Sequence, residues 1–592
     1  MTFEQTVLLL VLSLALILFV TERWRYDIVA LLALLAATLS GIVPADKAFS
    51  GFGHAAVITV AAVLVVGRAL QNSGLVDLLA AWVATAGNRP TLQILALSGV
   101  VALLSAIMNN VGALALLLPM AIRMARKSGH PPSVFLMPLA FGSLLGGMVT
   151  MIGTPPNIII AEFRNQNGVG PFRMFDFAPV GSGVALAGIL FMSLIGWRLI
   201  PRRKGQLSRE ELFRIEDYVA EVRLPEDSPQ AGKFLHELEE GMETEVTVVG
   251  LVRRNQRLLV PSGYERLQGG DILIVEADSQ ALKSWLDATK LELVGGKERD
   301  GEALGSEEVS VIEAVVKPNS PLEGNTAWTF NLRWRYGINL LGVARQGARL
   351  QQRLKSIQFL PGDILLLQGP RETLQEALSA MGCLPLAERG LRFGPRRLAL
   401  SIAIFALAIV AMAVGFFTAP IALVGAAVLM VLFKLVSLRE AYDSIDWPVI
   451  VLLGAMLPVG AAMESTGAAA LVANGLLHVS AQLPPAATLT LVLVGVMFLS
   501  DVVNNAAAAV LMAPVAISVA HGMGASADPF LMAVAVGASC AFLTPIGHQS
   551  NTLVMGPGGY KFGDYSRLGF PLEIIIVLVS VPLILWFWPL GV

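Results

Sequence analysis

Long apolar runs separated by short polar segments occupy most of the chain. Runs of about 20 residues can span a bilayer as helices. They occur near 5–21, 27–43, 54–72, 133–153, 176–200, 397–416, 419–437, 448–464, 529–547 and 569–590. The pattern predicts a polytopic α-helical membrane protein, with five transmembrane helices on each side of a central polar stretch.

Two further apolar segments, 92–126 and 485–520, are interrupted by paired asparagines. The pairs are Asn109-Asn110 in the first segment and Asn504-Asn505 in the second. Each arm is about as long as a half-spanning helix. Because polar backbone at that depth must line a wet cavity, we predict two re-entrant hairpins with polar tips.

Charged residues concentrate in the central stretch. Residues 205–394 contain 22 of the 42 Lys and Arg and 29 of the 44 Asp and Glu. This predicts a soluble insert between two membrane parts. The net charge of −2 offers no basic excess for binding nucleic acid. No nucleophile–base or paired-carboxylate site stands out, and the two cysteines form no zinc site, so we expect no enzyme and no cofactor.

The two membrane parts resemble each other. Fifteen residues from Met108 align without gaps on fifteen from Val503, and Thr150–Asn157 aligns on Thr544–Asn551. Each part crosses an odd number of times, which predicts two inverted repeats, 1–204 and 395–592. Gly and Pro in the second motif predict unwound spans. Inverted repeats with interrupted helices are typical of secondary transporters, although such residues can also merely permit close helix packing.

The distribution of basic residues predicts the orientation. Arg23 and Arg25 follow the first span, and basic residues favour the cytoplasmic side. We therefore expect a multi-pass protein of the inner (plasma) membrane, with the insert in the cytoplasm and both termini outside.

The paired tips, the segment Gly153–Asn157 and the segment Asn551–Tyr560 resemble the divalent anion:sodium symporters of the ion transporter superfamily. The resemblance implies an elevator-type carrier, normally a homodimer, whose tips bind sodium and the carboxylates of the substrate. The family's tips read Ser-Asn-Thr, whereas here Val111 and Ala506 replace the threonines. This departure weakens a dicarboxylate assignment, and Asn-Asn tips resemble permeases linked to sulfate.

The aligned motifs supply the candidate site residues. For the sodium ion they are Asn109, Asn110, Gly153, Asn504, Asn505 and Gly547. For the anion they are Asn110, Thr154, Asn157, Asn505, His548 and Asn551. Asp501 is a candidate coupling residue because ionisable groups at membrane depth are functional by default. Asp501 could instead cap the helix that follows it, and His548 could be structural.

The insert is itself a repeat. Residues 219–286 align without gaps on 311–378, and both copies contain Ser-Pro-x-x-Gly and Gly-Asp-x-Leu patterns. These patterns resemble the TrkA-C domain of potassium-channel regulators, which predicts two tandem α+β domains, 205–298 and 299–394. The resemblance implies pairing and a small regulatory ligand. We interpret Gly270-Asp271 as a turn before a strand rather than a ligand site.

These features together predict sodium-coupled uptake of a divalent anion, either sulfate or a di- or tricarboxylate. The expected partners are the small anion, the lipid bilayer, a second copy of the chain and a small regulator, but no nucleic acid. Two alternatives stay open. One is a sodium/proton antiporter in which Asp501 and His548 carry protons, and the other is a ligand-gated channel or sensor that uses the TrkA-C pair.

Overall fold

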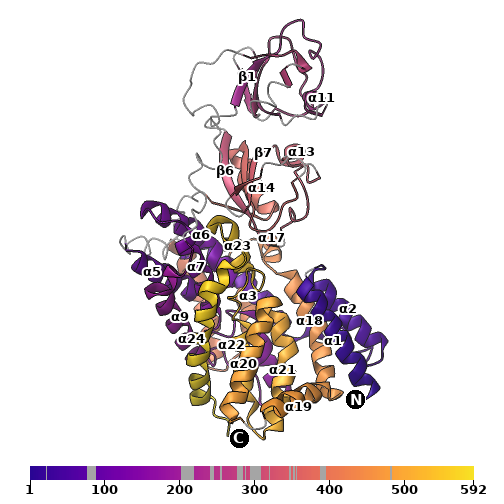
Figure 1. The fold of residues 1–592 in the computed structure, drawn as a ribbon, viewed down its shortest axis with the longest axis vertical. Helices are drawn as coiled ribbons and strands as arrows, with labels where there is room; N and C mark the ends of the chain where they lie inside the picture. The colour runs from indigo at the N-terminus through magenta and orange to yellow at the C-terminus, as the bar shows by residue number, and fades with distance from the viewer. Residues whose placement is uncertain are drawn as a thin grey trace.

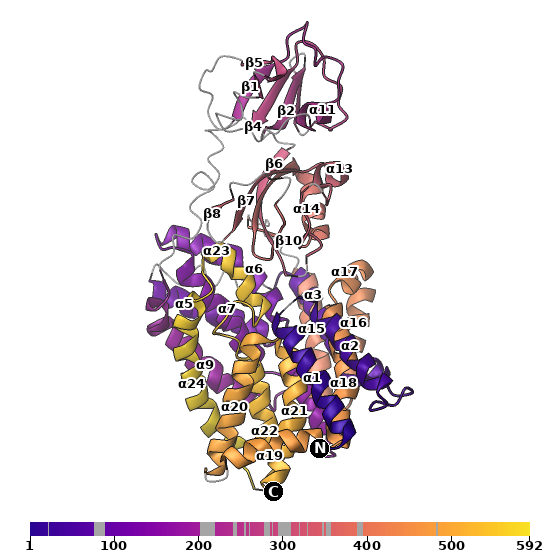
Figure 2. The ribbon, with the colours of Figure 1, turned by 45° about the vertical axis from the view of Figure 1, so that its right-hand side comes forward.

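The computed structural model consists of a helical part and a narrower insert that extends from one end of it (Figure 1). It describes residues 1–21, 23–75, 89–201, 219–240, 246–253, 256–259, 261–276, 285–286, 288–293, 309–318, 320–327, 329–345, 348–350, 354, 357–386, 395–480 and 483–591. Both termini lie at the end of the helical part opposite the insert (Figure 2). The predicted domain boundaries near residues 204, 298 and 394 lie outside the described residues.

The helical part is built from two sets of helices. The first set is α1 (Phe3–Thr21), α2 (Tyr26–Leu39), η1 (Ser50–Gly53), α3 (Ala55–Asn72), α5 (Pro90–Ser105), α6 (Asn110–Lys127), α7 (Ser133–Gly147), α8 (Pro155–Gln166), α9 (Ala178–Leu194) and η2 (Gly196–Arg198). The second set is α15 (Pro395–Ala413), α16 (Ala419–Leu432), α17 (Leu438–Asp443), α18 (Trp447–Ser465), α19 (Ala468–Ser480), α20 (Pro485–Val502), α21 (Asn505–Gly522), α22 (Ala527–Ala538), α23 (Gln549–Gly558) and α24 (Asp564–Phe587).

Each of the ten predicted spans contains a helix. Within the described residues, seven helices are long and apolar enough to cross a membrane, by length and composition. Four helices in these two sets, α8, α17, α19 and α23, were not predicted as separate elements. They are short or carry polar residues, so no apolar run marks them.

The two hairpins have longer arms than the sequence predicts. The arms α5, α6, α20 and α21 contain 16 to 18 residues, which is about 24–27 Å at 1.5 Å per residue. The prediction of half-spanning arms is therefore wrong. The asparagines sit at the turns, and each arm is longer than half the thickness of a bilayer of about 30 Å.

Two helices are broken where the sequence predicts unwound spans. Helix α7 ends at Gly147 and α8 begins at Pro155, while α22 ends at Ala538 and α23 begins at Gln549. The predicted spans 133–153 and 529–547 therefore stop early. Proline at the first position of α8 suits a helix start, because its missing N–H has no partner there in any case.

Equivalent hydrogen bonds stabilise the two breaks. The Thr150 hydroxyl donates to the Ala106 carbonyl, and the Thr544 hydroxyl donates to the Asp501 carbonyl at 2.6 Å. The side chain of Asn157 donates to Thr150 O at 2.8 Å, as that of Asn551 does to Thr544 O at 3.0 Å. The internal similarity of the sequence therefore corresponds to the same local geometry in both halves.

The helices pack in two groups. Helices α5, α7, α9, α20, α22 and α24 pack mainly on one another, whereas α1, α2, α3, α15, α16 and α18 pack with one another on the other side (Figure 2). Aromatic side chains occupy the core of the first group, where the Phe141 and Phe542 ring centroids are 4.9 Å apart.

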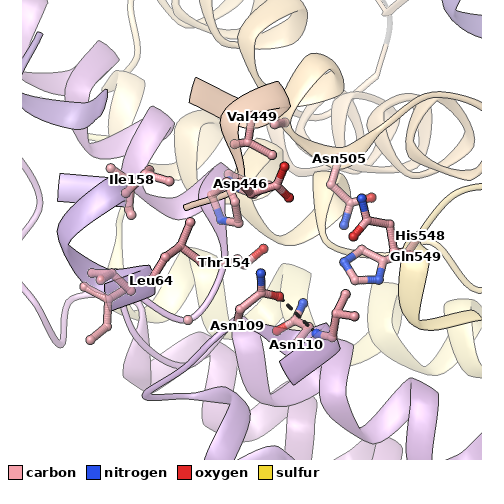
Figure 3. A pocket seen from close by; sticks show the side chains of 18 of the residues that line it. Leu64, Asn109, Asn110, Thr154, Ile158, Asp446, Val449, Asn505, His548 and Gln549 are labelled. Carbon is pink, nitrogen blue, oxygen red and sulfur yellow. Dashed lines mark hydrogen bonds between the residues drawn. The ribbon is translucent and has the colours of Figure 1, made fainter. Parts of the chain in front are cut away.

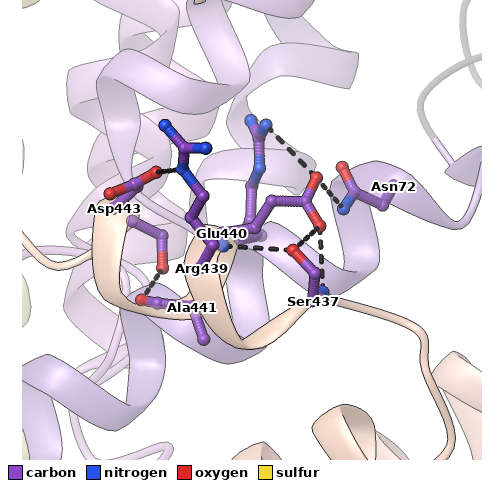
Figure 4. Close-up of polar contacts among 8 residues, drawn as sticks. Asn72, Ser437, Arg439, Glu440, Ala441 and Asp443 are labelled. Carbon is purple, nitrogen blue, oxygen red and sulfur yellow. Dashed lines mark hydrogen bonds and ion pairs between the residues drawn. The ribbon is translucent and has the colours of Figure 1, made fainter. Parts of the chain in front are cut away.

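Polar contacts join α17 to the end of α3 (Figure 4). Ser437 and Glu440 form a reciprocal capping box at the start of α17. Glu440 also accepts a hydrogen bond from Asn72 at 3.2 Å and lies 3.8 Å from Arg68. Burial raises the pKa of the Glu440 carboxyl, but the hydrogen bonds from Ser437 and Asn72 and the charge of Arg68 outweigh it, so the pKa is lowered.

The insert contains two antiparallel sheets of five strands with the same strand order. The first is β3-β2-β4-β1-β5, made of β1 (Val219–Arg223), β2 (Thr247–Arg253), β3 (Gln256–Leu259), β4 (Ile272–Glu276) and β5 (Glu292–Leu293). The second is β8-β7-β9-β6-β10, made of β6 (Val309–Val316), β7 (Asn339–Arg345), β8 (Ala348–Arg349), β9 (Ile364–Pro370) and β10 (Cys383–Pro385). The helices are α11 (Leu235–Glu240), α13 (Leu332–Tyr336) and α14 (Arg371–Ala380).

The Gly-Asp motifs of the insert are turns that stabilise each sheet. Gly270 and Gly362 both adopt φ of +85°, which glycine tolerates without strain. The buried Asp271 carboxylate accepts two hydrogen bonds from Arg253 at 2.9 and 2.8 Å. Because this charge is fully paired inside the fold, the interpretation of the motif as a turn is confirmed.

Candidate functional site

A cavity lined by apolar side chains and a few polar ones lies where several helices begin, between the two groups of helices. Its volume is about 70 Å³. It is lined by Val60, Val63, Leu64, Asn109, Asn110, Val111, Ile152, Gly153, Thr154, Pro155, Pro156, Ile158, Asp446, Val449, Asn504, Asn505, Ala506, His548 and Gln549. Figure 3 shows side chains from the two hairpin tips and both helix breaks around this cavity.

Four helix N-termini converge on the cavity. Helix α6 begins at Asn110, α8 at Pro155, α21 at Asn505 and α23 at Gln549, and all four residues line it. The first turn of a helix has N–H groups without an intrahelical partner and carries a partial positive charge. None of these described lining residues is Lys or Arg, so the helix ends supply the positive potential that suits an anion, against the carboxyl group of Asp446, which also lines the cavity.

The two asparagines of each tip have different roles. The first caps the helix that follows, because Asn109 Oδ1 accepts from the Val111 amide at 3.0 Å and Asn504 Oδ1 from the Ala506 amide at 2.9 Å. The second turns inward, because Asn110 and Asn505 are buried. Residues Asn109 and Asn504 are thus placed at the cavity but have a structural function there.

Two buried polar atoms at the cavity have no hydrogen-bond partner among the described residues. They are Thr154 Oγ1 and Asn505 Nδ2. Buried polar groups nearly always have a partner, so an unsatisfied one requires an explanation such as a bound ion or water. Both atoms can donate a hydrogen bond, which a bound anion would accept.

His548 lines the cavity at the start of α23. Its Nδ1 accepts a hydrogen bond from the Ser550 amide at 3.0 Å. Because Nδ1 acts as the acceptor, the proton of the neutral ring lies on Nε2. His548 therefore caps α23, which is the structural role that the sequence left open, and its neutral ring carries the N–H donor on Nε2.

Four predicted site residues do not line the cavity. The Asn157 and Asn551 amides donate to carbonyl groups of the breaks, including Ala541 O at 2.7 Å from Asn551. Gly547 lies behind the cavity, where an added Cβ would be 2.8 Å from Ser500 O. Asp501 is buried at the end of α20. These four residues lie around the helix breaks, outside the lining of the cavity.

Sequence reasoning missed three features. Asp446, which precedes α18, points into the cavity, and Gln549 lies beside His548 (Figure 3). Asp446 lies directly before Trp447-Pro448, an arrangement that marks a helix start, but nothing there indicates a cavity. The third feature is a pair of buried carboxyl groups, Asp501 and Glu573, which are 72 positions apart in the sequence.

Interrupted helices that meet in pairs at a cavity are typical of membrane transporters, and the fold and the site agree with a protein of this class. The sequence profile of the citrate transporter family matches residues 16–537. The chain therefore belongs to the citrate transporter family and is a multi-pass membrane transporter.

The names of similar proteins agree with this class. The chain is 32% identical to "Uncharacterized transporter YfbS" of Escherichia coli K12 over 98% of both chains. It is 30% identical to "Uncharacterized transporter sll0640" of Synechocystis over 98% of this chain and 96% of the relative. It is 26% identical to "Sodium/sulfate cotransporter 1" of Chlamydomonas reinhardtii over 57% of this chain and 40% of the relative.

Proposed function

We propose that the protein is a secondary active transporter that takes up a divalent anion together with sodium. The observation that carries this proposal is the convergence of four helix N-termini on one cavity that lacks Lys and Arg among its described lining residues. The unpartnered donors of Thr154 and Asn505 support it further, because both residues line the cavity.

Among divalent anions, the composition of the hairpin tips favours sulfate over a tricarboxylate. The loss of the tip threonines at Val111 and Ala506, and the relatives named as sodium/sulfate cotransporters, agree with sulfate.

Two oxygen clusters behind the tips are suited to sodium. In the first half, the carbonyl oxygens of Ser143 and Gly153 lie 3.2 Å from the Asn110 carboxamide, whose nitrogen donates to both of them and to Ser105 Oγ. In the second half, Ser500 Oγ lies 3.0 Å from Asn505 Oδ1 and 2.7 Å from Ala538 O. Hard cations take such oxygen ligands, so Asn110 and Asn505 are our first candidates for binding sodium.

The two groups of helices support an elevator-type movement. Residues of α3 and the start of α18 line one side of the cavity, and the hairpin tips and helix breaks line the other. A shift of the first group, which contains the hairpin arms α5 and α20 and the broken helices α7 and α22, against the second group would carry the cavity across the membrane. The inverted arrangement of the repeats, the homodimer and the cytoplasmic location of the insert are part of this proposal.

The insert is placed to regulate transport. The turn at Gly362 packs on α23, because a Cβ atom added to Gly362 would lie 3.0 Å from Thr552 O. Val315 and Ile364 of the second sheet share a hydrophobic core with the membrane helices. Helix α23 begins at the cavity, so a ligand that shifts this TrkA-C-like unit would act on the site through one helix.

Transport assays in proteoliposomes test the proposal. We expect labelled sulfate to accumulate when sodium is high outside, and succinate, citrate and phosphate to accumulate less. Asn110→Ala and Asn505→Ala should each abolish sodium-dependent uptake, because each removes an oxygen from a cation cluster and a group at the tip. Asn474→Ala is the control, since Asn474 is exposed on α19.

Three outcomes would contradict the proposal. Normal sodium-dependent uptake in both tip variants would reject the assignment of the site. Proton flux on addition of sodium, without any anion, would indicate an antiporter. Fast passive flux that never concentrates sulfate would indicate a channel.

A further inference from the structure

One carboxyl group faces the cavity, although the groups around it suit an anion. Asp446 lines the cavity and points into it from the start of α18 (Figure 3). It is the one acidic residue among the described lining residues, and none of these is Lys or Arg. A carboxylate at this place opposes the four helix N-termini and repels an anion that they attract.

The side chain of Asp446 does not cap its own helix. An aspartate directly before a helix normally accepts a hydrogen bond from the amides of the first turn. Asp446 holds that position before α18, but its side chain makes no capping hydrogen bond. The charges of Arg25 and Asp27 act on Asp446. These two residues have opposite signs and bind each other at 3.3 and 3.2 Å, so together they leave the charge of Asp446 unbalanced.

The equivalent helix of the first half begins without an acid. Asn72–Gly74 ends α3 as Ser465–Gly467 ends α18, and both glycines have positive φ. At the other end, α3 begins after His54, whose ring accepts a hydrogen bond from the Ala56 amide at 3.4 Å. A helix start at this place can therefore be capped without an acid, which indicates that the fold does not require the carboxyl group of Asp446.

Asp446 and the unpartnered donors of the cavity belong to different groups of helices. Asp446 precedes α18, which packs with α2 and α3. Thr154 and Asn505 lie at the starts of α8 and α21, beside the helix break and the hairpin tip. In the elevator-type movement proposed above, these donors shift relative to α18. A bound anion would therefore meet the charge of Asp446 in one part of the cycle and leave it in another.

We propose that Asp446 sets the affinity of the site, because its carboxylate weakens anion binding in this conformation and so favours release of the anion. The inference rests on the proposed anion transport. A unit charge ~7 Å from a dianion changes its affinity roughly sevenfold even at the dielectric constant of water. Changes of affinity at one site act mainly through the rate of dissociation, so the carboxylate should speed the release of a dianion.

Equilibrium binding of labelled sulfate to the purified full-length protein tests this role. The titration is done with sodium at pH 8, well above the ordinary aspartate pKa of about 3.9. Asp446→Asn should bind sulfate roughly fivefold or more tightly, whereas Asp446→Glu keeps the charge and should stay close to wild type. Asp443→Asn is the matched control, since Asp443 is an exposed acid of α17, and it should leave the affinity unchanged.

Uptake into proteoliposomes supplies a second readout. Asp446→Asn should lower the KM for sulfate and also lower the maximal rate, because a more tightly held anion is released more slowly. A merely structural defect would lower the rate without tightening binding. If Asp446→Asn does not fold, Asp446→Ser gives the same comparison, because serine removes the charge and can cap the helix.

Unchanged or weaker sulfate binding in Asp446→Asn would overturn the inference and leave the proposed function intact. Weaker binding with loss of sodium dependence would show that Asp446 binds a cation, and would overturn the inference too. If the wild-type protein binds succinate, citrate or phosphate instead of sulfate, only the proposed substrate fails, and the same comparison is made with that anion. A wild-type protein that binds none of the four anions would reject the proposed function and the inference together.

Discussion

The contact between the insert and helix α23 yields a prediction about Gly556→Ala. A methyl group at this position would overlap the carbonyl group of Gly362, whose carbon would lie 2.9 Å from the new Cβ. Both partners are backbone atoms, so no side chain can rotate away. The turn and the helix must instead separate.

The size of the effect follows from the contact. A gap of ~1 Å removes a quarter to a half of the dispersion attraction between the atoms that face it. Inserting a methyl group into a packed contact costs about 1–3 kcal/mol. A change of that size corresponds to about 5–150-fold in the equilibrium between docked and undocked insert. Alanine also favours a helix by ~1 kcal/mol relative to glycine, so the substitution does not by itself weaken the helical hydrogen bonds of α23.

Hydrogen–deuterium exchange of the full-length protein measures this equilibrium. We expect faster exchange in peptides that cover 357–366 and 549–560, and unchanged exchange in α1 and α16. Gly563→Ala is the matched control, because no atom lies within 4 Å of the added Cβ. Wild-type rates in both peptides would refute the predicted contact. Faster exchange throughout the membrane helices would indicate general destabilisation instead.

Three further predictions concern single residues. Arg164→Ala should lower the free energy of unfolding by about 2–3 kcal/mol, because it removes two hydrogen bonds of 2.8 Å to Asp528. This is somewhat less than for a fully buried ion pair, since Asp528 is only partly buried. An unfolding midpoint equal to that of Arg173→Ala would contradict this prediction. The pKa of Glu440 is lowered in the folded protein. The stability that its carboxylate contributes is therefore complete above its ordinary pKa of about 4.3 and is lost as the pH falls through the pKa of the folded state. The thermal unfolding temperature of Glu440→Gln should differ from that of the wild type at neutral pH and converge with it in acid. Burial raises the pKa of Cys383 to about 12, so maleimide should label it at neutral pH only after denaturation, and rapid labelling of the folded protein would oppose this.

The apolar runs and the repeats predicted the positions of the spans, both hairpins and both helix breaks. Such predictions succeed because hydrophobic length and internal similarity are properties of local sequence. The ends of the helices were less predictable. Helix α7 stops at Gly147 although the apolar run continues to 153, because the break is stabilised by hydrogen bonds from distant residues such as Thr150 to Ala106.

The direction of polar side chains could not be predicted from sequence. Asn157 and Asn551 lie in the predicted motifs, but their amides donate to carbonyl groups of the breaks rather than toward the cavity. A carboxamide can donate and accept, so its role depends on what tertiary packing places beside it. Asp446 and Glu573 were missed for the same reason, since their partners are far away in the sequence.

The glycines of the breaks do not distinguish close packing from a binding site. A Cβ added to Gly153 would lie 2.9 Å from Ser105 O, and one added to Gly547 would lie 2.8 Å from Ser500 O, so packing alone accounts for both glycines. The unpartnered donors of Thr154 and Asn505 fit the proposed binding site. An unsatisfied buried donor costs about 1–3 kcal/mol, and an anion bound between the four helix ends would accept hydrogen bonds from both.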